Sequence, residues 1–287
     1  MRRLPSAGVA VLLVLAGCAV ERREPPHQAA IAGAEDTLPL PTRRDTIAPP
    51  DSPLGASIRR GYALLHATRD SLPDHVGNDL RCVSCHLDGG TRANAMPWVG
   101  VVGRFPQYNA RAGRVITIAD RVNGCFRRSL NGRALAADSP EMRDIVAYFQ
   151  WLSAGVPNGA VLAGQGLPKP TALVGDSSAG RIAYASTCAR CHGEQGAGTH
   201  LGPPLWGPRS FNLGAGITRI RTMAGFLRHN MPYDAPGTLT EQQALDIAAY
   251  VTAQPRPDFP DKVHDWPHGD PPPDLNYPTA AGRRDTR

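Results

Sequence analysis

The pattern Cys-x-x-Cys-His occurs twice in the chain, as CVSCH at residues 82–86 and as CARCH at residues 188–192. Two thiols at this spacing can form thioether bonds with the two vinyl groups of a haem, and the adjacent histidine can coordinate its iron. A lone C-x-x-C also suits a zinc site or a redox-active disulfide, but the histidine that follows both pairs favours haem. The sequence therefore predicts two covalently bound haem c groups, one in each half.

The cysteine count supports this prediction. The chain has six cysteines, and four of them belong to the two motifs. The cysteines expected to hold the haems and the histidines expected to bind their irons are Cys82, Cys85 and His86 in the first half and Cys188, Cys191 and His192 in the second. The other two cysteines, Cys18 and Cys125, leave no obvious pair for a structural disulfide, so each needs its own explanation.

The first residues are typical of a bacterial lipoprotein signal. Arg2 and Arg3 precede an apolar run at residues 9–15, and the stretch LAGC at residues 15–18 ends in Cys18. The apolar run is too short for a membrane-spanning helix of the mature protein. We expect residues 1–17 to be removed and Cys18 to carry a lipid that anchors the protein to the membrane in the periplasm. An ordinary signal peptide cleaved elsewhere is the alternative.

The two ends of the chain are rich in proline. Residues 18–53 show little apolar periodicity and are expected to form a disordered tether. Residues 255–287 contain Pro271-Pro272-Pro273 and are expected to form an irregular tail that wraps the second domain. Between these ends lie roughly 200 residues, enough for two small domains.

The two halves repeat one another. The interval from His86 to Cys125 is 39 residues, and so is the interval from His192 to Met231 (125 minus 86, and 231 minus 192). The segments 58–68 and 179–187 are expected to form helices before the motifs, and helices with capping signals are expected from Ser139 and from Thr240. The sequence predicts an all-α fold of two tandem cytochrome c-like domains. Their ranges are residues 54–155 and 179–254, with a linker at residues 156–178.

Met231 is the expected second iron ligand in the second half. It is followed by Pro232 at the predicted end of a helix, where a thioether can face the iron, and such ligation raises the reduction potential of a haem. His229 is the alternative ligand, with Met231 then filling the core. We expect Met223 to be a core residue.

Cys125 occupies the equivalent position in the first half. As a thiolate it would bind iron and lower the reduction potential relative to methionine, and the arginines around it favour the deprotonated form. The alternative is a buried free cysteine, with Met96, His66 or His75 as the iron ligand. An unpaired cysteine in an oxidising compartment usually has a function, which favours ligation by Cys125.

The surroundings of Cys125 resemble a known family. The stretch NGCF at residues 123–126, followed by Arg128-Ser129 and Asn131-Gly132 and set between two C-x-x-C-H domains, is similar to the thiosulfate dehydrogenase family of periplasmic dihaem cytochromes. The similarity spans residues 52–254. It implies that the first haem, with histidine and cysteine as ligands, oxidises thiosulfate to tetrathionate. It also implies that the second haem passes electrons to a partner such as another cytochrome c or an oxidase.

The same resemblance implies a set of substrate-binding residues. By spacing, these are Arg111, Arg121 and Ser129, which join Cys125 at the expected catalytic centre. Some members of the family place a lysine directly before the methionine of the second haem and exchange ligands with redox state. This chain has Asn230 there, so we expect the second haem to keep histidine and methionine.

The distribution of charge is consistent with anionic substrates. The formal net charge is +6, and several arginines lie near Cys125. Arg121 and Ser129, four residues before and after Cys125, would share its face of a continuous helix. Arginines serve haem propionates equally well, so this enrichment alone does not identify a substrate site. We expect no nucleic-acid partner, because no binding motif is recognisable and the predicted location is extracytoplasmic.

Two other functions fit the same motifs. The first is a membrane-tethered dihaem electron carrier in a respiratory chain, without catalysis. The second is a sulfur-oxidation cytochrome that conjugates thiosulfate to a carrier protein, whose catalytic haem also has a cysteine ligand. That function requires a partner subunit, and a second haem domain with Met231 argues against it.

Overall fold

The computed structural model describes residues 37–41, 48–171 and 174–282. The predicted signal peptide, Cys18 and most of the predicted tether therefore lie outside the described residues. Within the described ranges, none of the helices combines the length and the apolar character needed to cross a membrane.

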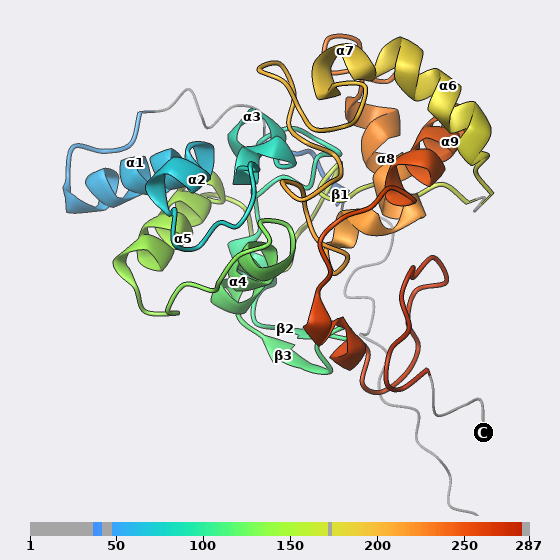
Figure 1. The fold of residues 1–287 in the computed structure, drawn as a ribbon. Helices are drawn as coiled ribbons and strands as arrows, with labels where there is room; N and C mark the ends of the chain where they lie inside the picture. Colours follow the sequence, from blue (N-terminus) through green and yellow to red (C-terminus); the bar gives the residue numbers. More distant parts are fainter. Residues whose placement is uncertain (1–36, 42–47, 172–173, 283–287) are drawn as a thin grey trace, which may run out of the picture. The chain divides into compact units, whose positions relative to one another are not determined.

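Helices dominate both halves, as predicted for an all-α fold (Figure 1). The first half consists of β1 (Thr37–Leu38), α1 (Pro53–His66), α2 (Thr68–Ser71), η2 (Cys82–Ser84), α3 (Leu87–Gly90), η3 (Val102–Arg104), β2 (Gln107–Asn109), β3 (Arg114–Ile116), α4 (Ile118–Arg128) and α5 (Pro140–Leu152). The second half consists of β4 (Val161–Leu162), α6 (Ser177–Thr187), α7 (Ala189–His192), η4 (Gly216–Thr218), α8 (Ile220–Asn230), α9 (Glu241–Thr252) and η5 (Pro260–His264). The short strands add a parallel β1–β4 pair and an antiparallel β2–β3 hairpin.

The helices begin where their capping residues lie. The Ser139 hydroxyl accepts a hydrogen bond from the Met142 amide at the start of α5, and Pro140 occupies the first helical position. Thr240 and Gln243 form a capping box at the start of α9. Both predicted helix starts are therefore found in the structure.

A glycine allows two helices to approach closely in each half. In the first half α1 packs against α5, and a methyl group added at Gly61 would lie 2.0 Å from the Asp144 carbonyl oxygen. In the second half α6 packs against α9, and a methyl group at Gly180 would lie 1.9 Å from the Asp246 carbonyl oxygen. The two halves thus repeat the same helix pair with the same close approach.

An aspartate reinforces each of these helix pairs. The buried side chain of Asp144 accepts hydrogen bonds from Ser57 and from Arg60, whose Nε lies 2.7 Å from Oδ2. In the second half, Asp246 Oδ1 accepts a hydrogen bond of 2.8 Å from the Asp176 backbone amide at the start of α6. Both carboxylates therefore tie the last helix of a half to its first.

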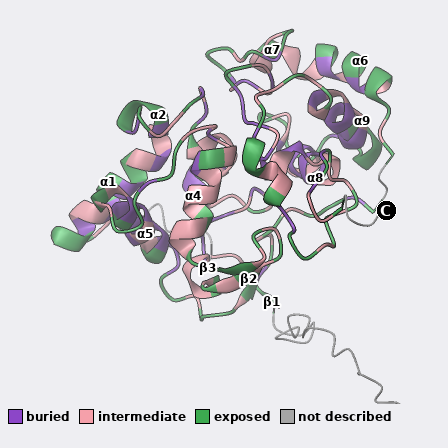
Figure 2. Ribbon diagram, turned by 60° about the horizontal axis from the view of Figure 1, so that its bottom comes forward, coloured by how far each residue is buried: buried purple, intermediate pink, exposed green. Residues whose placement is uncertain are grey.

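The buried faces of α5, α8 and α9 contribute much of the core (Figure 2). Aromatic side chains are prominent in it, with Trp98 and Phe149 at a centroid distance of 5.0 Å in the first half. Tyr184 and Trp206, also 5.0 Å apart, make the corresponding contact in the second. One buried apolar cluster includes residues of both halves, so the core is continuous across the repeat.

The C-terminal tail contacts both halves. We expected it to wrap the second domain, and the Asn276 side chain does donate a hydrogen bond to the Thr218 carbonyl there, at 3.4 Å. However, the Trp266 amide also donates a hydrogen bond of 2.9 Å to the Arg111 carbonyl of the first half. The expectation was therefore incomplete, because polar groups of the tail find partners in the β2–β3 turn as well.

Replacing Gly61 with alanine tests the helix contact. The added methyl group would force α1 and α5 apart, and we expect a loss of about 1–3 kcal/mol in the free energy of unfolding, the usual cost of overpacking. Gly180→Ala should cause a similar loss in the second half. Gly166→Ala is the control, since a methyl group there meets no atom within 4 Å. Thermal unfolding of the haem-loaded variants measures the effect, and equal stability of Gly61→Ala and Gly166→Ala would contradict it.

Candidate functional site

The histidine of the first motif is oriented by a backbone carbonyl. His86 follows η2, and its amide bonds to the Cys82 carbonyl at 3.1 Å. Its Nδ1 lies 2.7 Å from the carbonyl oxygen of Met96. An imidazole that donates from Nδ1 presents the lone pair of Nε2 to a metal. The ring is further held by Trp98, at a centroid distance of 4.9 Å.

The second motif repeats this arrangement. The Nδ1 atom of His192 lies 2.8 Å from the Pro203 carbonyl oxygen. The carbonyl comes 11 residues after the histidine, against 10 in the first half. The C-x-x-C-H pattern does not reveal these carbonyls, because they belong to loops without a recognisable motif.

Cys125 is carried by α4. A capping box starts this helix, with the Thr117 hydroxyl accepting from the Asp120 amide at 3.1 Å and the Asp120 carboxylate accepting from the Thr117 amide at 2.9 Å. Asp120 also binds Arg114 at 3.0 Å, and this contact is the main reason that its pKa is well below the usual range. The helix start is therefore fixed two turns before Cys125.

The environment of Cys125 favours its thiolate. Exclusion of water raises the pKa of the thiol, but nearby positive charge, that of Arg121 above all, outweighs this effect and lowers the pKa to about 6. Arg121 Nη1 lies 2.9 Å from Cys125 Sγ. By contrast, burial raises the pKa values of Cys82 and Cys85 to about 12, and the charge of Cys125 contributes to both.

The side chains around the first motif suit a covalently bound haem. The thiols of Cys82 and Cys85 could form its thioether bonds, and both lie close enough to Cys125 for its charge to affect their pKa values. The imidazole of His86 and the sulfur of Cys125 are a nitrogen and a sulfur donor that could bind the iron. The residues present therefore fit the cofactor that the motif indicates.

The predicted substrate residues are only partly brought together. Arg121 contacts Cys125, as the helical spacing predicts. Ser129 caps the end of α4, and its amide bonds to the Cys125 carbonyl. Arg111 lies in the turn between β2 and β3, and its guanidinium binds Asp265 at 3.0 Å and Tyr277 at 2.6 Å. Its present partners are thus in the C-terminal tail.

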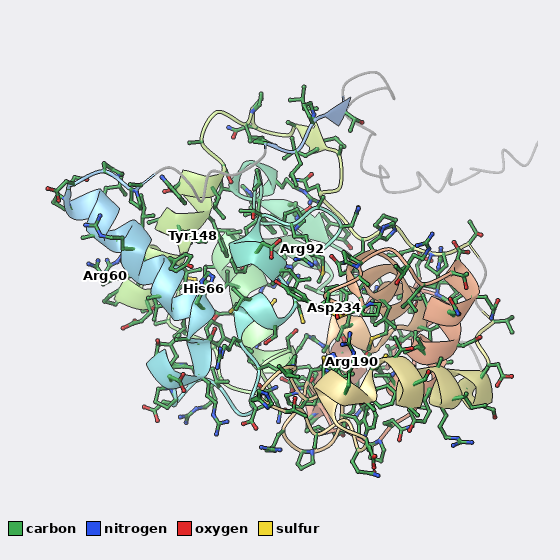
Figure 3. All side chains as sticks on the ribbon, turned by 90° about the horizontal axis from the view of Figure 1, so that it is seen from above. Arg60, His66, Arg92, Tyr148, Arg190 and Asp234 are labelled. Atoms are coloured by element: carbon green, nitrogen blue, oxygen red, sulfur yellow. The ribbon has the colours of Figure 1, made fainter. Side chains whose placement is uncertain are left out.

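A cavity of about 490 Å³ surrounds the second motif. Its lining is mainly apolar, with Phe211, Phe226 and Ile247 among the residues that form it, and it contains both His192 and Met231. An apolar cavity between an imidazole and a thioether suits a haem with histidine and methionine as ligands. The ion pair of Arg190 and Asp234, at 2.6 Å, also lines this cavity (Figure 3).

The same cavity reaches the first motif. Val83, Ser84 and Cys85 line it together with Cys188 and Cys191. The two haem attachment sites are therefore neighbours across the contact between the halves. Because electron transfer weakens steeply with distance, this proximity favours exchange of electrons between them.

The alternative ligands occupy other positions. Among the described residues that line the cavity, Met231 and Met223 are both present and His229 is not, and Met223 is also buried in the core as expected. His66 stacks on Tyr62 at a centroid distance of 3.8 Å and lines a separate cavity beside α1 and α5 (Figure 3).

The two remaining alternatives make contacts of their own. His75 has its Nδ1 atom 3.2 Å from the Arg133 carbonyl oxygen. Met96 provides the backbone carbonyl that contacts His86 Nδ1 and orients the ring.

Asn230 links the two sites and was not recognised as a link from the sequence. It is completely buried, and its Nδ2 donates to the Asn94 carbonyl of the first half at 2.7 Å and to the Phe226 carbonyl at 3.1 Å. Asn94 lies two residues before Met96, whose carbonyl orients His86. The only signal in the sequence was a polar residue directly before Met231.

Comparison with known proteins extends these observations. Residues 75–158 match the family model described as SoxA/TsdA, cytochrome c domain. Residues 175–251 match the model described as Cytochrome C oxidase, cbb3-type, subunit III. Each matched region contains one C-x-x-C-H motif, so the chain has two cytochrome c domains and carries two covalently bound haem c groups. The predicted fold class is thereby confirmed.

Relatives are similar over nearly the whole chain. A thiosulfate dehydrogenase of Allochromatium vinosum is 48% identical over 267 residues, which are 89% of this chain and 95% of that protein. One of Psychrobacter arcticus is 41% identical over 86% of this chain and 78% of that protein. Among solved structures, thiosulfate dehydrogenase TsdBA of Marichromatium purpuratum aligns with a TM-score of 0.71 and 38% identity over 77% of this chain. This chain spans 50% of that longer protein. On this evidence, the chain belongs to the thiosulfate dehydrogenase family.

Proposed function

We propose that this protein oxidises thiosulfate to tetrathionate at its first haem site and passes the electrons through the second haem to an external acceptor. The observation that carries the proposal is the contact of Cys125 with Arg121, whose Nη1 lies 2.9 Å from Sγ and whose charge lowers the pKa of the thiol. An electron carrier needs no such thiolate, because histidine and methionine suffice for transfer. The relatives named for thiosulfate oxidation support the same conclusion.

In this proposal each haem has two protein ligands. His86 and Cys125 bind the first iron, and His192 and Met231 bind the second. Thioether bonds from Cys82 and Cys85, and from Cys188 and Cys191, fix the two groups. When bound, each haem iron supplies a one-electron oxidation or reduction.

The stoichiometry agrees with two such sites. Joining two thiosulfate ions forms one sulfur–sulfur bond and releases two electrons, and the chain provides two one-electron sites in adjoining positions. Thiosulfate carries two negative charges, so bringing two ions together requires positive groups that offset their repulsion. Arg121 lies beside the thiolate, and Arg111 and Ser129 complete the proposed binding residues.

The proposed domain boundaries are those expected from the sequence, with residues 54–155 around the first haem and residues 179–254 around the second.

We also propose that the protein lies in the periplasm, held at the membrane by a lipid on Cys18. That location would place the second haem near a partner such as another cytochrome c or an oxidase. Palmitate incorporation that is lost in Cys18→Ala tests the anchor.

Replacing Cys125 with alanine tests the catalytic role. We expect thiosulfate-dependent ferricyanide reduction to fall on the order of 100-fold or more at equal haem loading, the scale of losing a central catalytic group. Cys125→Met is the matched variant, because it keeps a sulfur donor for iron and removes the thiolate. Tetrathionate is identified as the product in wild type. No turnover in wild type would indicate an electron carrier, and a protein-bound product would indicate conjugation to a carrier protein.

Replacing Met231 with alanine tests the second ligand set. The near-infrared absorption band of methionine-ligated ferric haem should disappear, while the thiolate-ligated haem is unchanged. Met223→Leu is the control, because Met223 lines the same cavity, and it should keep the band if Met223 serves only as a core residue. If the band survives in Met231→Ala, another methionine is the iron ligand.

Replacing Arg121 with glutamine tests the origin of the thiolate. The positive charge of Arg121 lowers the pKa of Cys125, so the thiolate persists to lower pH than it would without that charge. Without the positive charge the pKa of Cys125 should rise. We expect the magnetic circular dichroism of thiolate-ligated haem to be lost at a higher pH in the variant. If wild type and variant lose the signal at the same pH, Arg121 does not stabilise the thiolate.

A further inference from the structure

A carboxylate from the C-terminal tail lies among arginines of the first half. Asp265 follows η5, and its side chain is 5% exposed. It accepts hydrogen bonds from Arg111 Nε at 3.0 Å, from Arg128 Nη1 and Nη2 at 2.9 and 2.7 Å, and from the Tyr277 hydroxyl at 2.6 Å. One carboxylate of the tail therefore joins two arginines that are 17 residues apart in the sequence (128 minus 111).

The tail holds Arg111 at several points. Besides the bond to Asp265, Arg111 Nη2 donates to the Tyr277 hydroxyl at 2.6 Å. The guanidinium carbon lies 5.0 Å from the centroid of the Trp266 ring, and the Trp266 amide donates to the Arg111 carbonyl. The tail thus contacts the backbone of Arg111 and both the edge and the face of its guanidinium group. The side chain therefore has little freedom to change its rotamer.

The tail also holds the end of the helix that carries Cys125. Arg128 is three residues after Cys125 in α4, and it binds Asp265 through both terminal nitrogens. Its guanidinium carbon lies 4.3 Å from the centroid of the Phe259 ring, another residue of the tail. Displacing the tail would therefore release both Arg111 and the last turn of α4.

Positive charge remains in excess around this carboxylate. Burial, followed by the charge of Arg111, lowers the pKa of both Arg128 and Arg219, so Arg111 is close enough to repel each of the other two. Asp265 accepts hydrogen bonds from two of these arginines, Arg111 and Arg128. Burial raises the pKa of Tyr277, which keeps its hydroxyl protonated and able to donate to Asp265. Such a cluster attracts anions and needs a fixed carboxylate to keep its cations together.

We propose that Asp265 and Tyr277 are positioning residues for the reaction, which hold Arg111 and the end of α4 in the geometry that binds thiosulfate. This inference rests on the proposed function, because it takes Arg111 as a group that contacts the substrate. The residues act through the arginines and do not touch the reacting sulfur atoms. The tail is thereby a component of the active site, although it lies outside both regions that match cytochrome c domains.

Steady-state kinetics of Asp265→Asn test the role. The substitution keeps the size of the side chain and removes the charge that orients the arginines, so we expect the KM for thiosulfate to rise about tenfold or more, the equivalent of one charge-assisted hydrogen bond to the anion. The kcat should change much less, because Cys125 and the haems remain in place. Asp258→Asn is the matched control, since Asp258 pairs with Lys262 in the same tail and its side chain is 59% exposed.

Tyr277→Phe provides a second test that leaves the buried charges paired. It removes only the hydroxyl that donates to Asp265 and accepts from Arg111, and we expect a smaller rise in KM. Haem content and melting temperature are measured for every variant. If Asp265→Asn fails to load haem, the kinetics of Tyr277→Phe decide the question.

The outcomes separate this inference from the proposed function. Absence of thiosulfate turnover in wild type contradicts the proposed function alone. The positioning role is then read from the affinity of the oxidised protein for thiosulfate, measured by spectral titration without turnover. A KM and an affinity within twofold of wild type in both variants would overturn the role. A lower KM in Asp265→Asn would also overturn it, since it would show that the carboxylate competes with the substrate.

Discussion

Stabilising a thiolate inside the protein is the constraint on which the first site depends. Burial alone would raise the pKa of Cys125 and favour its protonated form. The positive charge of Arg121 reverses this tendency. The proposed iron ligation and the proposed sulfur chemistry both need the deprotonated sulfur, so both follow from one local balance between desolvation and positive charge.

This balance requires that α4 hold Cys125 and Arg121 in a fixed position, and contacts at both ends of the helix fix it. The capping box of Thr117 and Asp120 sets the start of the helix, and the tail carboxylate of Asp265 binds its last turn. The loop after the first motif orients His86 and is joined to the second half by Asn230. Contacts from distant parts of the chain therefore reach both the helix and the loop that orients the imidazole.

The sequence predicted the parts of this arrangement that are local or periodic. The two motifs and the equal intervals to Cys125 and Met231 indicated the haem sites and the repeat, and the helical spacing placed Arg121 beside Cys125 correctly. The carbonyls that orient the histidines, the Asn230 contact and the binding of Arg111 by Asp265 were not foreseen. Each of these contacts joins residues that only the tertiary structure brings together. Arg111 and Asp265, for example, are 154 positions apart, and no local sequence pattern identifies such partners.

Low-temperature electron paramagnetic resonance of the oxidised, haem-loaded wild-type protein tests the central claim most directly. A ferric haem bound by imidazole and thiolate has a low-spin signal with a narrow spread of g values, whereas imidazole and thioether produce a wider one. The ligand sets of His86 with Cys125 and of His192 with Met231 predict both signals at equal intensity. A spectrum without the thiolate signal would contradict the account, because the first site would then lack the group on which its proposed chemistry depends.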